Sequence, residues 1–136
     1  MANTNIVGVT SIIGTSAYVI PASSGTASAA WITDTSTAAT GLTPASGSIT
    51  RVTSIVACNT TATAATASIA ISNNATYASG TPYYIAYQVS VPPNASLIIT
   101  DKTTSFYITS GQSVGATSGT GSAITYTATV ETIIGT

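Results

Sequence analysis

The side chains that could carry out chemistry are few in this sequence and widely spaced. The chain has no histidine and one cysteine, Cys58, and its charged residues are Asp34, Arg51, Asp101, Lys102 and Glu131. Without histidine the usual general base near neutral pH is missing, and Ser–His and Cys–His nucleophile pairs are excluded. The carboxylates stand in three separate segments and form neither a calcium-binding loop nor the carboxylate pair of a glycosidase. We therefore expect no catalytic residue, no metal site and no cofactor, and a protein that is not an enzyme.

The same composition excludes two further kinds of partner. Two basic residues cannot neutralise a phosphate backbone, so we expect no binding to nucleic acid. No apolar run approaches the ~18 residues of a membrane-spanning helix, and the opening sequence MANTNIVGV lacks the basic region of a secretory signal. Cys58 has no partner for an internal disulfide and is expected to be a small buried residue on a strand.

The low charge also predicts the character of the surface. Only 4% of the residues are charged, against ~25% in typical soluble domains, and the net charge is −1. The 44% of hydrophobic residues are enough for a folded core, so Thr, Ser and Ala must cover much of the outside. A surface with almost no net charge tends to associate. We therefore expect the chain to pack against copies of itself or against a partner.

Alternation of apolar and hydroxyl residues predicts β-strands along most of the chain. The pattern is clearest over 123–133, where Ile124, Tyr126, Ala128 and Val130 are expected to face inward. Residues 48–72 are expected to form a hairpin of two strands, 49–58 and 66–72, and the second strand should have one face in the core and a hydroxyl face outside it. Alternation breaks between Val52 and Ile55, which indicates either a β-bulge near Thr53 or a strand buried on both faces.

Short strands with turn signals between them predict the fold class. We expect an all-β chain that forms a single antiparallel β-sandwich, jelly-roll or immunoglobulin-like, with seven or eight short strands. Residues 1–14 are expected to be an extended N-terminal arm or first strand, and residues 15–136 the sandwich domain. The low-complexity segments 22–30 and 34–47 are expected to be loops.

The candidate interface residues are apolar or aromatic side chains outside an obvious core position. In a regular strand Tyr83 and Tyr87 are expected on one face and Tyr84 on the other, so some of these rings must lie outside the core. They serve either an interface or the edge of the sandwich, which they would cap. Trp31 is expected to anchor either the core or an interface. The interface candidates are Ile6, Val7, Val9, Ile12, Ile13, Trp31, Tyr83, Tyr84 and Tyr87.

Six segments between about residue 49 and residue 133 form a recognisable series: RVTSIVACNT (51–60), TASIAI (66–71), VPPNASLII (91–99), DK (101–102), FYITSGQSV (106–114) and VE (130–131). With these segments the sequence resembles small β-sandwich virion proteins of tailed bacteriophages, those of cyanophages especially. Proteins of that kind are commonly head-decoration or cement proteins, often trimeric, and similar domains occur in neck, tail and fibre parts. The resemblance brings no catalytic residue with it.

The resemblance implies a structural protein of a virus particle. Its partners would be the major capsid protein or other virion proteins, together with further copies of itself in a homo-oligomer such as a trimer. Its location would be the capsid surface. In this hypothesis the arm, residues 2–13, reaches a neighbouring subunit. Two other interpretations stay open. One is a tail, neck or fibre subunit, and the other, of a different class, is a module that binds surface glycans through exposed tyrosines, Trp31 and neutral loops.

Overall fold

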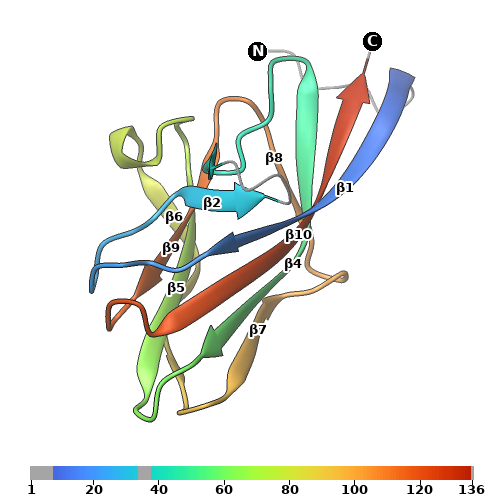
Figure 1. Cartoon of the computed structure of the whole chain (residues 1–136). Helices are drawn as coiled ribbons and strands as arrows, with labels where there is room; N and C mark the ends of the chain where they lie inside the picture. The colour runs from blue at the N-terminus through green and yellow to red at the C-terminus, as the bar shows by residue number, and fades with distance from the viewer. Residues whose placement is uncertain (1–7, 34–37, 136) are drawn as a thin grey trace.

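Two antiparallel sheets packed face to face form the protein, which confirms the expected all-β sandwich (Figure 1). The computed structural model describes residues 8–33 and 38–135. These residues form ten strands, more than the seven or eight expected, and a short 3-10 helix, η2. The elements are β1 (Val9–Val19), β2 (Ala30–Thr33), β3 (Ala38–Thr40), β4 (Ser48–Asn59), β5 (Ala65–Ser72), η2 (Tyr77–Ser79), β6 (Pro82–Val91), β7 (Ser96–Thr100), β8 (Phe106–Ile108), β9 (Ser113–Ser118) and β10 (Ile124–Gly135).

The larger layer, here called the large sheet, is built around β10. Its strand order is β3-β2-β1-β10-β4-β7, and β8 also pairs with β4. In β10 the side chains alternate as the sequence predicts, with Ile124, Tyr126, Ala128 and Val130 buried. Strand β1 pairs with β10 from Val9 to Val19. The first strand therefore runs across the boundary expected between an arm and the domain.

The second layer, here called the small sheet, has the order β6-β5-β9. Strand β4 belongs to the large sheet and β5 to the small one, so the predicted hairpin over residues 48–72 is wrong. The chain crosses between the layers after Asn59, whose side-chain amide donates to the carbonyls of Thr63 at 2.8 Å and Val91 at 3.0 Å. Alternation shows which residues share a face of a strand but not which strand lies beside it, and that is why the sequence pattern missed the crossing.

Two aromatic residues of the large sheet bind the backbone of the small sheet through the core. Trp31 is fully buried and donates from Nε1 to the carbonyl of Val114 at 3.0 Å. The hydroxyl of Tyr126, also fully buried, accepts the N–H of Ser68 at 3.1 Å and donates to the carbonyl of Thr117. Trp31 is thus a core anchor. These bonds add direction to a hydrophobic contact that would otherwise fix the two layers only loosely.

The irregularity expected in β4 is a β-bulge. Thr129 pairs with Ser54 and Val130 pairs with Val52, which leaves Thr53 as the extra residue. Its hydroxyl donates to the carbonyl of Thr129 at 2.8 Å. The bulge restores the inward orientation of Val52 and Ile55, both of which are fully buried.

Three local expectations differ from the structure. The segment 34–47, expected to be a loop, contains the strand β3. This strand pairs with β2 and forms one edge of the large sheet. Cys58, expected to be buried, is half-buried. The hydroxyl face of β5 is covered, because Ser68 and Ser72 are buried on the side that was expected to lie outside the core.

Candidate functional site

Three of the four charged side chains in the described residues, Arg51, Glu131 and Asp101, serve local structure. Arg51 and Glu131 are register partners on β4 and β10, and their side chains form an ion pair of 3.6 Å. Asp101 closes a turn by accepting the N–H of Thr103 at 2.9 Å and the hydroxyl of Thr103 at 2.6 Å. These hydrogen bonds favour the carboxylate and hold the pKa of Asp101 below its usual value. Asp34 lies outside the described residues.

Neither a metal cluster nor a membrane-crossing helix is found in the part of the chain that the structure describes. Within residues 8–33 and 38–135, no group of three His, Cys, Asp or Glu side chains could hold a metal ion. Over the same residues, the helical segment is too short to cross a membrane.

The outer face of the large sheet carries a row of five side chains, four apolar and one threonine, across five neighbouring strands. Register pairs place Ile32 beside Tyr18, Tyr18 beside Thr127, Thr127 beside Val56, and Val56 beside Ile98. We call these five residues the outer row. Ile98 is 66% exposed and Ile32 is 48% exposed, although both lie on a paired strand. A row of this kind is unusual on a surface that faces only water.

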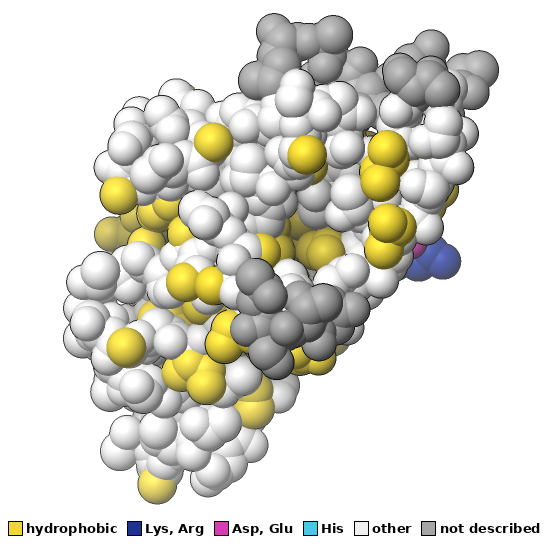
Figure 2. All heavy atoms as spheres, turned by 45° about the horizontal axis from the view of Figure 1, so that its top comes forward, with side chains coloured by type: hydrophobic (Ala, Val, Ile, Leu, Met, Phe, Trp, Pro, Cys, Tyr) yellow, Lys and Arg dark blue, Asp and Glu magenta, His cyan; other side chains and the backbone are white. Residues whose placement is uncertain are grey.

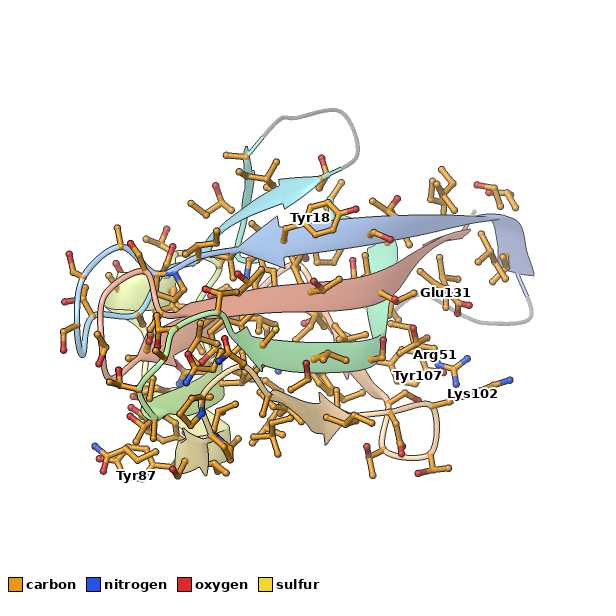
Figure 3. All side chains as sticks on the ribbon, turned by 60° about the horizontal axis from the view of Figure 1, so that its bottom comes forward. Tyr18, Arg51, Tyr87, Lys102, Tyr107 and Glu131 are labelled. Atoms are coloured by element: carbon orange, nitrogen blue, oxygen red, sulfur yellow. The ribbon has the colours of Figure 1, made fainter. Side chains whose placement is uncertain are left out.

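The outer row adjoins a shallow depression at its Tyr18 and Ile32 end. The depression has a volume of about 410 Å³ and is lined by Tyr18, Ile20, Ile32 and Thr125, among others. Figure 3 shows Arg51, Tyr107, Lys102 and Glu131 gathered at one end of the large sheet, with Tyr18 farther along β1. The space-filling view shows one face on which blue and magenta atoms are confined to one edge (Figure 2). Among the residues that the structure describes, none of the five in the outer row is charged.

The three tyrosines of β6 lie differently from the alternation that the sequence predicts. Tyr84 pairs with Ala70 and Ala86 pairs with Ile69, so Ile85 is an extra residue, and a second irregularity follows at Tyr87 and Gln88. Because of the first bulge, Tyr84 and Tyr87 come to the same face, and their rings meet edge to face with centroids 4.6 Å apart. The pattern had placed Tyr87 with Tyr83 instead.

A groove runs over the outer face of the small sheet beside these rings. Its volume is about 240 Å³. We call it the tyrosine groove. It is lined by Gly25, Ala27, Thr66, Ser68, Tyr77, Pro82, Tyr84, Tyr87, Gln88, Thr117 and Gly119.

The predicted interface residues fall into separate parts of the molecule. Trp31 lies in the core, whereas Tyr83, Tyr84 and Tyr87 are exposed on β6. Val9 is half-buried, and Ile12 and Ile13 are exposed on β1, where they pair with β10 of the same chain. Ile6 and Val7 lie outside the described residues.

The sequence did not predict the outer row, nor that Gln88 lines the tyrosine groove. Tyr18 lies in the part of the sequence assigned to the sandwich domain, but only the pairing of β1 with β2 and β10 shows that Tyr18 has Ile32 beside it. Ile98 sits in the run Leu97–Ile99, in which three consecutive apolar residues hide the alternation.

In comparisons with known proteins, no family model, no curated protein and no solved structure matches this chain.

Proposed function

We propose that this chain is a non-enzymatic structural protein of a virus particle, a decoration or cement protein of a tailed-phage head. In this proposal it docks on the major capsid protein and on copies of itself, and it stabilises the shell by occupying many equivalent positions. Two independent lines support the proposal. One is the resemblance of residues 49–133 to small virion β-sandwiches, and the other is the character of the outer face of the large sheet.

The observation that carries the proposal is the outer row. Ile32, Tyr18 and Ile98 expose apolar surface on a rigid, regularly hydrogen-bonded sheet, so that covering them would cost little conformational entropy. Burial of apolar area contributes roughly 25 cal/mol per Å² in water. Because few ionic groups would take part, such a contact would be almost insensitive to salt.

The location is tested by the copy number of the protein relative to the major shell protein, measured by quantitative mass spectrometry on separated heads and tails of the source particle. A number close to that of the shell protein, found on heads, supports decoration or cement. A small fixed number confined to tails would replace that proposal with a neck, tail or fibre subunit. Absence from particles would refute the virion proposal.

The docking face is tested by rebinding of purified protein to heads from which it has been removed. Ile98→Asp places a carboxylate in the outer row, and we expect it to lose binding measured by co-sedimentation. Tyr83→Asp is the matched control, because Tyr83 is 60% exposed on the small sheet, away from the row. Equal binding by the two variants would show that the outer row is not the docking face.

The suggested role of the N-terminal arm needs a different experiment from deletion. Residues Val9–Ile13 form the first part of β1 and pair with β10 of the same chain. Removing residues 2–13 would therefore cut a strand of the large sheet and confuse loss of docking with loss of folding. Ile12→Asp leaves the backbone pairing in place and tests whether this exposed side chain contacts a neighbour.

A further inference from the structure

We propose that the tyrosine groove binds one sugar unit of a neutral oligosaccharide. This site would be separate from the proposed docking face, because it lies on the small sheet and the outer row lies on the large one. Figure 3 shows Tyr87 well away from the charged end of the large sheet. The proposal therefore does not depend on whether the protein docks on a phage head.

The rings supply the apolar part of such a site. A sugar ring has one face of C–H groups, which packs against an aromatic ring, and a rim of hydroxyls. Tyr84 is 51% exposed and Tyr87 is 59% exposed, and their edge-to-face contact gives them a fixed mutual orientation. Tyr77 adds a third ring, half-buried at the same groove. Ordered aromatic rings bind with a small loss of conformational entropy.

The floor and the far wall supply neutral hydrogen-bonding groups. Thr66, Ser68 and Thr117 contribute hydroxyls, and Gln88 contributes an amide that can both donate and accept. The lining contains no Asp, Glu, Lys or Arg. Sugars carry many hydroxyls and, when neutral, no charge, so this lining complements them. An acidic sugar would gain nothing, because no cation of the lining could meet its carboxylate.

The backbone around the groove holds these groups in place. Gln88 has a positive φ of 49° at the second bulge of β6, a conformation that is costly for a residue other than glycine, and its N–H donates to Ser68 Oγ at 2.8 Å. On the opposite side, a Cβ at Gly119 would lie 2.2 Å from the hydroxyl oxygen of Thr66. Glycine at this position therefore leaves the hydroxyl of Thr66 in its observed place.

The size of the groove limits what it can hold. About 240 Å³ is smaller than the ~300–1,000 Å³ of pockets that enclose a drug-sized ligand. The groove is open to solvent along one side, as its exposed rings show. It therefore suits one sugar unit within a longer chain, with weak affinity for each site. Several copies of the protein on one surface would raise the apparent affinity through multivalency.

The test is a titration of the full chain with neutral oligosaccharides, followed by ¹H–¹⁵N NMR. The probes are maltohexaose, cellohexaose, fully N-acetylated chitohexaose, mannohexaose and a galactan hexamer, each taken to millimolar concentration, with a hexamer of galacturonic acid as the charged comparison. We expect at least one neutral probe to shift the amide signals of Gln88, Ser68 and Thr117. We expect no stronger binding by the acidic hexamer.

Three single variants and one double variant decide whether the groove is responsible. Tyr87→Ala and Tyr84→Ala should each weaken binding by about tenfold, whereas Tyr83→Ala should leave it unchanged. Tyr83 is a matched control, since it lies on the same strand and is equally exposed but does not line the groove. Thermal unfolding would show that each variant is folded. The proposal is overturned if none of the neutral probes binds, if binding survives in the Tyr84→Ala, Tyr87→Ala double variant, or if Tyr83→Ala weakens it as much.

Discussion

Replacing Tyr126 by phenylalanine would remove a single hydroxyl from the centre of the sandwich. That hydroxyl joins the N–H of Ser68 on β5 to the carbonyl of Thr117 on β9, and the residue is fully buried. The variant would leave a buried donor and a buried acceptor, each worth ~1–3 kcal/mol when unsatisfied. Because Ser68 and Thr117 are register partners, the two groups can move toward each other. We therefore expect the free energy of unfolding to fall by about 2 kcal/mol, the lower end of the roughly 2–6 kcal/mol that the two groups would cost together.

The same hydroxyl should make stability depend on pH in the alkaline range. Burial raises the pKa of Tyr126 from 10.0 to about 12, because a buried phenolate would lose its hydration. The unfolded chain therefore releases this proton at lower pH than the folded chain. The contribution of Tyr126 is complete below pH 10 and is lost as the pH rises through about 12, and the full difference corresponds to about 3 kcal/mol.

Urea unfolding followed by the fluorescence of Trp31 would measure both effects, since Trp31 is the only tryptophan and is buried. At pH 7 the wild type should exceed Tyr126→Phe in stability by about 2 kcal/mol, and the gap should close or reverse by pH 12. Tyr107→Phe, at a tyrosine that is half exposed, should match the wild type throughout. A variant as stable as the wild type at pH 7, or a gap that stays constant with pH, would refute the bridging role of this hydroxyl.

Three further changes test other parts of the structure. Gly115→Ala would put a Cβ 2.4 Å from the ring of Tyr77, so we expect the free energy of unfolding to fall by about 1–3 kcal/mol, measured by thermal unfolding. The displaced ring should also weaken the binding of any sugar probe that the wild type binds. An unchanged melting temperature would contradict the close packing of Gly115 against Tyr77. Arg51→Ala should cost under about 1 kcal/mol by thermal unfolding, because the pair with Glu131 is partly exposed and such pairs contribute little. Added salt screens this pair, so the difference between the variant and the wild type should shrink further in salt, and a difference that grows would contradict the role of the pair. Asp101→Ala should destabilise the fold above pH 4, and the difference from the wild type should vanish on acidification through the lowered pKa; a difference that persists in acid would exclude the carboxylate as its cause.

The sequence predicts well those features that depend on the two faces of one strand. Alternation from Ile124 to Val130 placed the inward residues of β10 correctly, and the break after Val52 indicated the bulge at Thr53. In both cases the signal lies within a few neighbouring residues. Burial of one face and exposure of the other dictates which residue types can occupy each position.

What the sequence could not predict depends on contacts between distant segments. Ser68 is on the outer face of β5, yet its side chain is buried because the tyrosines of β6 and Tyr77 of η2 lie around it. The residue pattern of β5 does not indicate that these segments cover it. The bulge at Ile85 moves Tyr84 and Tyr87 to one face, whereas a regular strand would separate them. The tyrosine groove and the outer row both arise from register between strands, and register is invisible in a single strand.

The position of β10 has a consequence for biosynthesis. This strand lies between β1 and β4 and pairs with both over almost its whole length, from Val9–Gly135 at one end to Asn59–Ile124 at the other. During translation β1 and β4 leave the ribosome long before residues 124–135. Until β10 is made, the edges of β1 and β4 that pair with it keep their backbone N–H and C=O groups unpaired. Pairings so distant in sequence form slowly, and open edges associate. A chain that ends before β10 should therefore aggregate during synthesis, and folding should begin in the small sheet, whose strands are all available by residue 118.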